Sequence, residues 1–352
     1  MKSVLVTGGA GFIGSHTSLV LLEEGFNVFV IDSLINSYAE SIHRVRKIFK
    51  YNSPKAKNDI YFFNCDLCDI KKTDLIFQNI YLKGFLLEGI IHIAGFKYVT
   101  ESIKKPNYYW SNNLKSTLNI IKLMKKYKCK NMVFSSSAAI YGQVNNKPIL
   151  ENFKKKPENP YANTKLFIED LLEREAILND SDFKFLSLRY FNPIGAHPSG
   201  EIGENSKSNL SNIFPILIKA SNNDKYEFKV YGNDWPTYDG TCIRDYIHVM
   251  DLAEAHINAL FFLKENNYKY LGLNIGTGKG TSVLEILNIF QKVNKVKINF
   301  KFSPRRSGDS GVLFAETSLS KKLLNWKASR SIEEMCKDAW NWNSKYPEGY
   351  SF

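Results

Sequence analysis

Two residues one helical turn apart, Tyr161 and Lys165, carry side chains that together can move a proton. Pro160 precedes them and begins a helical pattern, so both side chains share one helix face. A tyrosine with a pKa of about 10 is a poor base at neutral pH, but a neighbouring ammonium favours its phenolate. The pair can therefore supply a general base. The same spacing also arises by chance as a surface pair, so its meaning depends on the rest of the chain.

A run of serines, Ser135–Ser137, ends the short apolar segment Met132–Phe134, which predicts a buried strand. A hydroxyl at the end of such a strand can relay or orient the proton of a substrate. Serines at strand ends also serve as turn formers, and the residues alone leave both interpretations open for Ser137.

A glycine-rich turn follows the first apolar run and opens the first helical pattern: Gly8, Gly9, Gly11 and Gly14 stand around Phe12 and Ile13. A dinucleotide site needs such a turn, because the backbone must approach a pyrophosphate closely and the helix must pack tightly on the strand. The helix N-terminus then offers N–H groups and partial positive charge to the phosphates. We therefore predict a dinucleotide cofactor here.

An acidic residue, Asp32, stands at the end of the second predicted strand. A carboxylate there accepts hydrogen bonds from the adenine ribose and repels a 2′-phosphate, which favours NAD over NADP. Asp66 and Leu67 end the third strand and are expected at the adenine edge. With this cofactor in place, the nicotinamide cation would favour the Tyr161 phenolate further, and Lys165 could hold the nicotinamide ribose.

The first half of the chain alternates short apolar runs with helical patterns such as Ser15–Glu24 and Ser111–Tyr127. This alternation predicts an α/β fold, a doubly wound parallel Rossmann sheet with ligands at the carboxyl ends of its strands. The predicted strands are Ser3–Thr7, Asn27–Ile31, Ile60–Asn64, Gly89–Ile93, Met132–Phe134 and Phe185–Arg189.

A smaller α+β substrate-binding lobe is predicted after about Asn192, where a stretch rich in Gly, Pro, Ser and Asn begins. Its strands are expected at Phe228–Tyr231 and Lys297–Phe302, and its helices at Ile213–Ala220 and Val283–Val293. We thus expect an NAD-binding domain at residues 1–192 and the second lobe at residues 193–352. Residues 243–263 are a candidate segment for packing back on the first domain.

Composition and charge limit the kinds of partner that are expected for this chain. The net charge of +12 could suggest a nucleic-acid ligand, but the lysines of Ile120–Lys130 alternate with apolar residues as on a solvated helix face. Recognised nucleic-acid motifs are absent, so no nucleic-acid partner is expected. No apolar run reaches the roughly 20 residues that cross a bilayer, and none resembles a signal peptide. We expect a cytoplasmic protein without a membrane partner.

The five cysteines include a C-x-x-C pair, Cys65 and Cys68, which could be a redox pair or half of a zinc site. No second pair follows at a usable spacing, so no metal is expected. An odd number of cysteines without a secretory signal is typical of free thiols in a reducing compartment.

Taken together, these motifs resemble the extended short-chain dehydrogenase/reductase family, and within it the UDP-glucose 4-epimerases, over essentially the whole chain. The segments that carry the resemblance are Val4–His16, Ile91–Lys97, Phe134–Gly142, Pro160–Lys165, Arg189–Gly200, Arg244–Leu252 and Pro304–Asp309. Several are long and unusual, so chance does not explain them.

The resemblance implies a role for each matching position. The catalytic set would be Tyr161, Lys165 and Ser137. The NAD site would be lined by Gly8, Gly11, Phe12, Ile13, Gly14, Asp32, Asn36, Asp66, Leu67, Lys97 and Asn113, with Tyr161, Lys165 and Phe191 at the nicotinamide. The UDP-sugar would be held by Ser137, Asn192, Asn212, Arg244, Arg306 and Asp309. Guanidinium forks suit the diphosphate, although Arg244 could instead pair with Asp245.

The implied reaction interconverts UDP-galactose and UDP-glucose. Tyr161 would take the proton of the sugar 4-hydroxyl while carbon 4 is oxidised by NAD, and the 4-keto sugar would turn over and be reduced on its other face. The family also implies a homodimer, and the apolar pattern of Ser111–Tyr127 is compatible with one.

Three positions depart from the family pattern. Ser33 replaces an asparagine after the second strand, Ser307 replaces a glutamate, and Leu313 occupies the position that limits sugar size. A leucine is intermediate in size between the bulky and the small residues found there, so acceptance of N-acetylated UDP-sugars stays open. UDP-glucose and UDP-galactose are the preferred substrates.

Rival functions make different demands. A nucleotide-sugar dehydratase typically needs an Asp-Glu pair after the strand-end hydroxyl, where this chain has Ala138 and Ala139. That counts against a dehydratase, and a decarboxylase is a further sibling alternative. A silent NAD-sensing protein on the same fold would be expected to lose the Tyr161–Lys165 pair, which is present.

Overall fold

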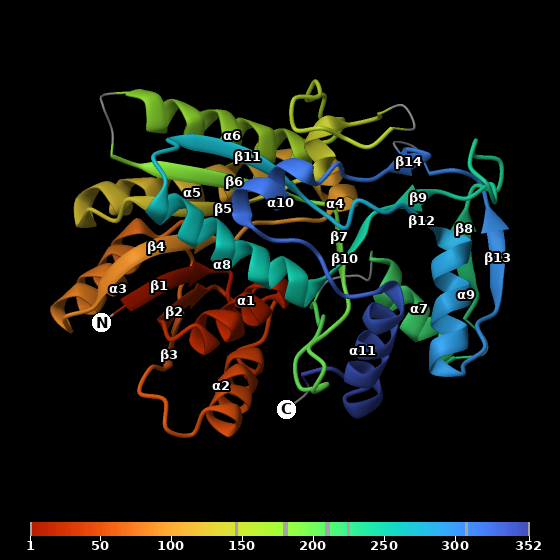
Figure 1. Ribbon diagram of the computed structural model, residues 1–352, viewed down its shortest axis with the longest axis horizontal. Coiled ribbons are helices and arrows are strands. Elements are labelled where there is room, and N and C mark those ends of the chain that lie inside the picture. The colour runs from red at the N-terminus through yellow and green to blue at the C-terminus, as the bar shows by residue number, and fades with distance from the viewer. Residues whose placement is uncertain are drawn as a thin grey trace.

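The computed structural model describes residues 2–144, 147–178, 182–207, 212–223, 226–306 and 309–350. Within these ranges the central element is a seven-stranded sheet in the order β11-β6-β5-β4-β1-β2-β3 (Figure 1). Its strands are β1 (Lys2–Thr7), β2 (Asn27–Asp32), β3 (Ile60–Asn64), β4 (Leu86–His92), β5 (Asn131–Ser137), β6 (Lys184–Tyr190) and β11 (Tyr270–Ile275). Every neighbouring pair is parallel, which confirms the predicted doubly wound sheet.

Helices cover both faces of the sheet because the strands are apolar on both sides. On β1, Val4 and Val6 face one core with the helices α1, α2 and α8, whereas Leu5 faces the other core with α3, α5 and α6. These helices are α1 (Phe12–Glu23), α2 (Glu40–Asn52), α3 (Ile70–Leu82), α5 (Pro106–Tyr127), α6 (Pro160–Ile177) and α8 (Val249–Glu265). A short helix, α4 (Val99–Lys104), precedes α5.

The strand order reverses between β1 and β4, which are neighbours although two strands separate them in the sequence. The loops after these strands leave the carboxyl edge in opposite directions, and in such sheets the resulting crevice binds ligands. The glycine turn after β1 and the segment that starts at Ile93 both lie at this point.

The second half of the chain contributes to the sheet as well as to a smaller unit. Helix α8 packs on α1, and β11 lies at the edge of the sheet beside β6. The apolar periodicity of the sequence did not predict β11. Both elements lie beyond residue 192, so the first layered unit includes residues that were assigned to the second lobe. The division of the chain into two domains at that residue stays a prediction.

The smaller unit lies at the other end of the molecule, where α7, α9, β8 and β13 gather (Figure 1). Its core joins Phe214, Leu217, Val230, Phe290 and Met335. The elements are β7 (Asn192–Ile194), α7 (Ile213–Ser221), β8 (Phe228–Tyr231), β9 (Ile243–Arg244), β10 (Tyr246–His248), β12 (Thr281–Ser282), α9 (Val283–Asn294), β13 (Phe300–Ser303), β14 (Val312–Leu313) and α11 (Ile332–Lys345). Helix α10 (Ser318–Leu324) packs instead on α8 and β11 of the central unit. Short strands and helices mix in the smaller unit, which confirms the predicted α+β lobe.

Candidate active site

The glycine turn after β1 has no room for side chains. Gly8 has a left-handed φ of 71°, and a Cβ on it would lie 2.7 Å from the backbone nitrogen of Ala94. A Cβ on Gly14 would lie 2.2 Å from the carbonyl oxygen of Gly8, so α1 packs directly on the turn. No side chain caps the N-terminus of α1 at Gly11 in this described stretch, which leaves amides of the first turn for a ligand.

A cavity of about 160 Å³ opens beside this turn at the carboxyl edge of the sheet. Ten of the residues predicted for the cofactor line it: Gly8, Gly11, Phe12, Ile13, Gly14, Asp32, Asn36, Asp66, Leu67 and Lys97. Ser33, where the chain departs from the family pattern, lines it too. The structure thus brings together side chains from the ends of β1, β2, β3 and β4. We call this space the first cavity.

Asp32 is held at the end of β2 by the loops around it. Its carboxylate accepts hydrogen bonds from the amides of Ala10 (3.0 Å) and Leu34 (2.9 Å) and from the Ser37 hydroxyl (2.8 Å). Burial raises the pKa of Asp32, and these donors oppose that rise. The carboxylate is therefore oriented before any ligand arrives.

Three loops meet over the first cavity through a cluster of hydrogen bonds that the sequence analysis did not predict. Ser206 donates to Asn36 Oδ1 at 2.6 Å and also contacts the Tyr98 hydroxyl, to which Asn36 Nδ2 donates at 3.2 Å. Nearby, the Lys207 ammonium donates to the carbonyl of Leu34 at 2.8 Å. We call the three residues Asn36, Tyr98 and Ser206 the clasp. They come from loops far apart in the sequence, and no local motif marks Ser206.

Asn113, predicted to line the cofactor site, makes its hydrogen bonds to the protein. Its Oδ1 accepts from the Phe96 amide at 2.8 Å, and its Nδ2 donates to the Phe96 carbonyl at 3.2 Å and to Thr164 Oγ1 at 3.1 Å. Asn113 thus ties the loop after β4 to α5 and α6. It lies behind residues 95–97 of the cavity wall, and its place in the NAD site stays a prediction.

Tyr161 and Lys165 lie in the first turns of α6, whose N-terminus is well formed. Asn159 caps it by accepting from the Ala162 amide at 2.9 Å, and Pro160 occupies the first helical position. The Lys165 ammonium donates to the Ser135 carbonyl at 2.6 Å and lies 5.9 Å from the centroid of the Tyr161 ring. Burial lowers the pKa of Lys165 to about 7, with the charge of Glu169 opposing the shift.

Ser137 stands where β5 ends, against the phenol of Tyr161. Burial raises the pKa of Tyr161, and a hydrogen bond with the Ser137 side chain works against that rise. The Ser137 hydroxyl also accepts from the Ala139 amide at 3.2 Å, at the start of the short 3-10 helix η1 (Ala138–Tyr141). The structure therefore brings the three predicted catalytic side chains together.

This set lies next to the wall of the first cavity. A Cβ on Gly95, a lining residue, would come within 3.8 Å of the Lys165 ammonium nitrogen. Phe191 follows β6 and packs in a small apolar cluster with Tyr141 and Ile149, against which Leu313 also packs. Tyr161, Lys165 and Phe191 are outside the lining of the first cavity itself, so their contacts with a cofactor stay predictions.

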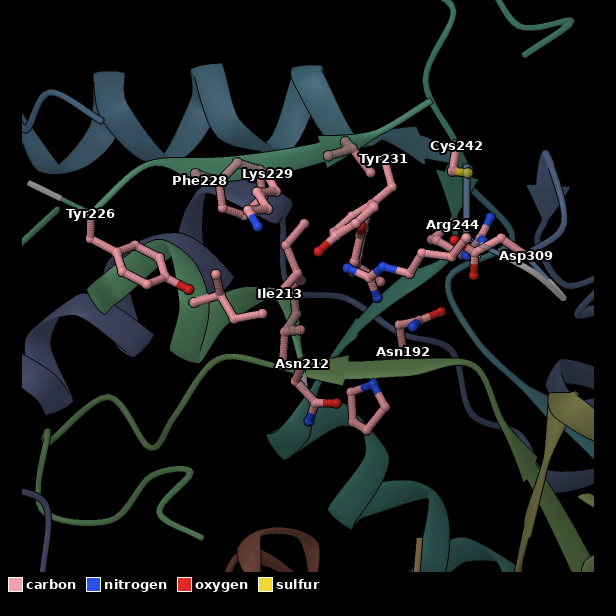
Figure 2. Close-up of a pocket in the computed structure, with 16 residues that line it drawn as sticks. Asn192, Asn212, Ile213, Tyr226, Phe228, Lys229, Tyr231, Cys242, Arg244 and Asp309 are labelled. Atoms are coloured by element: carbon pink, nitrogen blue, oxygen red, sulfur yellow. Dashed lines mark ion pairs between the residues drawn. The ribbon is translucent and has the colours of Figure 1, made fainter. Parts of the chain in front are cut away.

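A second cavity, of about 250 Å³, lies in the smaller lobe (Figure 2). Five residues predicted for the UDP-sugar line it: Asn192, Asn212, Arg244, Arg306 and Asp309. Figure 2 shows Arg244 and Asp309 on one side of this space and Asn212 on another. Of the three departures from the family pattern, Ser307 lies outside the described residues.

The two arginines of the second cavity are held in different ways. Arg244 donates to the carbonyls of Ile243 (2.9 Å) and Ser310 (2.8 Å), and its Nη2 lies 3.9 Å from Asp309 Oδ1. Arg306 stacks its guanidinium on the Tyr231 ring, 3.7 Å from the centroid. Tyr231 ends a strand that the sequence predicts, but no sequence pattern marks it as a cavity residue.

Asp245, the alternative partner for Arg244, faces elsewhere. Its buried carboxylate accepts from Thr277 (2.8 Å from the amide and 2.7 Å from the hydroxyl), from the Gly278 amide (3.0 Å) and from the Ala315 amide (3.1 Å). These bonds fix the loop after β11. Asp245 is therefore engaged by other donors, and the Arg244 guanidinium lies at the cavity beside Asp309.

Glu204 links the two cavities. It lines the first cavity, where it pairs with Lys97 at 3.5 Å, and its Oε1 accepts from Asn212 Nδ2 of the second cavity at 2.6 Å. A ligand that spans both spaces would pass this residue. No sequence pattern marked Glu204, because its partners are distant in the chain.

The C-x-x-C pair follows β3. Cys65 lines the first cavity and Cys68 contacts Asn112, and all five cysteines are free thiols. Over the described ranges, no group of three or more His, Cys, Asp or Glu side chains is arranged to hold a metal ion. In the same ranges, no helix combines the length and the apolar character of a bilayer-crossing segment.

A doubly wound parallel sheet, a glycine turn at its switch point and a Tyr–Lys pair on α6, with the lysine buried, define a short-chain dehydrogenase/reductase. Comparison with known proteins narrows this class. A family model described as GDP-mannose 4,6 dehydratase matches residues 5–339. UDP-glucose 4-epimerase 2 of Arabidopsis thaliana is 45% identical over 99% of this chain and 97% of its own length. The chain belongs to this nucleotide-sugar family and, within it, to the UDP-glucose 4-epimerases.

Solved structures agree with this membership. UDP-glucose 4-epimerase from Stenotrophomonas maltophila, with bound NAD and a formylated UDP-arabinopyranose, superposes with a TM-score of 0.91 at 37% identity, covering 98% of this chain and 99% of the other. The enzyme from Bifidobacterium longum, in complex with NAD⁺ and UDP, gives a TM-score of 0.90 at 38% identity, covering 99% and 100%. The resemblance read from the sequence is thereby confirmed.

Proposed function

We propose that this chain interconverts UDP-galactose and UDP-glucose through a 4-keto intermediate. The observation that carries the proposal is the placement of Tyr161, Lys165 and Ser137 beside the first cavity, with a separate cavity nearby that two arginines and two asparagines help to line. Ser137 on β5 lies in register with Tyr190 on β6. Asn192, which lines the second cavity, follows Tyr190 by two residues, so the catalytic set and this cavity are close together. A sugar anchored by its nucleotide in the second cavity can thus present carbon 4 to the catalytic set.

The residues of the first cavity fit NAD. The glycine turn leaves no room for a Cβ, so backbone amides can approach a pyrophosphate, and Asp32 is oriented to receive ribose hydroxyls. Lys97 also lines this cavity and carries a positive charge there, beside Glu204. NAD, when bound there, supplies the reversible two-electron oxidation of carbon 4. Related epimerases from Stenotrophomonas maltophila and Bifidobacterium longum hold NAD in their crystals.

The chain's own residues then handle the proton and the substrate. Tyr161 takes the proton from the sugar 4-hydroxyl and returns it after the keto sugar has turned over, with Ser137 orienting the hydroxyl. The Lys165 ammonium stabilises the phenolate that this exchange requires. Arg244 and Arg306 bind the diphosphate, and Tyr231 offers an aromatic surface to the base. The sugar itself must stay loosely held, since it has to rotate.

UDP-glucose and UDP-galactose are the proposed substrates. Leu313 is half-buried and packs against the cluster that contains Phe191 and Tyr141, so the space beside the proposed nicotinamide position is bounded by a bulky side chain. This supports exclusion of the larger N-acetylated sugars. Ala138 and Ala139 follow Ser137 where a dehydratase would need carboxylates, which supports epimerisation over dehydration.

The decisive experiment gives purified protein UDP-galactose without any added electron acceptor. UDP-glucose should form, because the cofactor is regenerated within each turnover. Stoichiometric consumption of external NAD would instead indicate a net dehydrogenase. The same assay on N-acetylated UDP-hexoses tests the substrate range: a comparable rate on both kinds of sugar would contradict the boundary assigned to Leu313.

We also propose that the protein works as a homodimer in the cytoplasm. Leu118 on α5 and Phe167 on α6 are 43% and 47% exposed, and Trp110 packs edge-on against Phe167 at 5.5 Å. These side chains form an apolar surface on two neighbouring helices, which suits a second copy of the chain. Five free thiols suit a reducing compartment.

A further inference from the structure

A buried carboxylate lies one helical turn beyond the catalytic lysine. Tyr161, Lys165 and Glu169 follow one another at four-residue spacing along one face of α6. Glu169 is fully buried, with 0% of its surface exposed, although it lines neither cavity. A buried carboxylate is costly unless its charge is compensated, so its partners decide what it does.

Three side chains engage the carboxylate of Glu169. Arg189 contacts both carboxylate oxygens, from Nη2 at 2.8 Å and from Nε at 3.0 Å, in the bidentate manner typical of strong pairs. Ser136 donates from its hydroxyl at 2.5 Å, and Lys155 approaches at 3.3 Å. Burial by itself would raise the pKa of Glu169, but Arg189, Lys155 and Ser136 outweigh it and hold the pKa below its ordinary value. The carboxylate is therefore ionised at working pH.

The ion pair is fixed by the sheet beneath it. Arg189 on β6 is in register with Ser136 on β5 and with Asn274 on β11, so the three form a row across the strands. Arg189 also donates to the Tyr141 hydroxyl at 2.8 Å, which in turn donates to Asn274 at 2.7 Å. Neither the guanidinium nor the carboxylate can move without breaking this row.

The other groups around Lys165 carry no negative charge at neutral pH. From β4, His92 bonds to two threonines, and burial lowers its pKa to about 3, so it is neutral. From β6, Tyr190 is buried and its pKa lies above the ordinary value. The pKa of Tyr161 on α6 is raised as well, so this side chain is also neutral. Among the described residues, the acid that acts electrostatically on Lys165 is Glu169. Arg189 and Lys155 act on the carboxylate of Glu169.

We propose that Glu169 is a positioning residue of the reaction: its carboxylate, anchored by Arg189, keeps Lys165 cationic beside Tyr161. Lys165 and Glu169 also form hydrogen bonds with consecutive residues of β5, namely the Ser135 carbonyl and the Ser136 hydroxyl. The same face of α6 therefore places the carboxylate near Lys165 and fixes the end of β5 that carries Ser137. The inference rests on the proposed function, since it concerns the same catalytic set.

The direct test follows the titration of Lys165 in the full chain with NAD bound. Lysine is labelled with carbon-13 at Cε, and the Lys165 signal is assigned by its absence from Lys165→Met. In Glu169→Gln the midpoint should fall by roughly 1 pH unit, because an opposite charge that favoured the ammonium has been removed. Glu173→Gln, one turn further along the same face and exposed, is the matched control and should titrate like the wild type.

Activity provides the second readout. Since the ammonium is the working form of Lys165, a lower midpoint should move the alkaline limb of the kcat profile to lower pH by the same amount. A structural effect alone would lower kcat without moving the limb. The NMR titration needs no sugar, so a wild type that fails to epimerise would sink the proposed function while leaving the effect on Lys165 measurable.

A buried cation left unpaired destabilises a fold, so Glu169→Gln is paired with the double variant Glu169→Gln/Arg189→Gln, which removes both charges. A lowered Lys165 midpoint in either folded variant supports the proposal. An unchanged midpoint in a folded variant would overturn it. Failure of both variants to fold would overturn it as well, because the pair would then serve the fold and not the lysine.

Discussion

At the scale of single residues, the chemistry depends on burial as much as on residue type. Lys165 is buried and Tyr161 is half-buried. Desolvation favours the neutral form of each side chain, which lowers the pKa of Lys165 and raises the pKa of Tyr161. A lysine whose pKa lies at about 7 can change its charge within the working range, which an exposed lysine cannot. The catalytic pair is thus sensitive to the charge of a bound cofactor and of Glu169.

Replacing Tyr161 by phenylalanine tests the proton transfer. Tyr161→Phe keeps the ring that packs beside Lys165 but removes the hydroxyl, so kcat should fall by at least about 100-fold, the usual contribution of a general base. Bound NAD, measured after denaturing the purified protein, should be unchanged. Tyr268→Phe removes a hydroxyl from a half-exposed tyrosine away from the site and serves as control. Full activity of Tyr161→Phe would remove this residue from its proposed place.

At the scale of elements, the site is assembled from strand ends and the loops that follow them. The glycine turn is a local device, because its geometry depends on residues within one βα unit. The clasp is different: Asn36, Tyr98 and Ser206 belong to the loops after β2, β4 and β7. Its bonds close the three loops over the first cavity, so the clasp should slow the release of a bound dinucleotide.

Ser206→Ala removes the hydroxyl that joins the clasp. The hydroxyl takes part in two hydrogen bonds, with Asn36 and with Tyr98. Since one neutral hydrogen bond is worth about 1 kcal/mol, the dissociation rate of NAD should rise by at least roughly 5-fold, while kcat at saturating NAD should change little. Stopped-flow fluorescence after displacement measures the rate. Ser221→Ala, which loses one bond to the Ile218 carbonyl on α7, is the matched control. Equal release from both variants would show that the clasp does not limit dissociation.

At the scale of the whole molecule, distant parts of the chain are joined by side chains. Arg44 on α2 lies in an aromatic cage of the C-terminal region, with its guanidinium 3.8 Å from the centroid of the Tyr346 ring and 5.0 Å from that of Tyr350. It also donates to the Glu201 carbonyl at 3.2 Å. The cage links the NAD-binding half to α11, which packs on α9 and β10 of the smaller lobe.

The proposed homodimer is tested on its apolar surface. Leu118→Glu places a charge on α5 where the second copy is expected, so light scattering coupled to size exclusion should report a single chain instead of two. Leu75→Glu on α3 changes an equally apolar residue that is 63% exposed, and should leave the mass unchanged. A monomeric wild type, or dimers of both variants, would contradict this surface.

Local features of the sequence were sufficient for six of the seven strands of the central sheet and for the chemistry. The apolar runs predicted six strands of the central sheet, since a buried parallel strand reads as a continuous apolar segment. The glycine turn and the Tyr161–Lys165 spacing predicted a dinucleotide site and a base because both patterns lie within one turn or one helix. These are interactions between near neighbours, which a linear sequence displays directly.

The remaining features depend on which distant segments meet. Strand β11 joins the sheet beside β6, although about 80 residues separate them and its periodicity is unremarkable. Glu169 reads as an ordinary helical glutamate until Arg189 is found opposite, and Ser206 and Glu204 read as loop residues until their partners are known. Sequence alone thus determined the reaction class, whereas tertiary structure decided the charge and positions of the working groups, because burial and long-range pairing exist only in the folded chain.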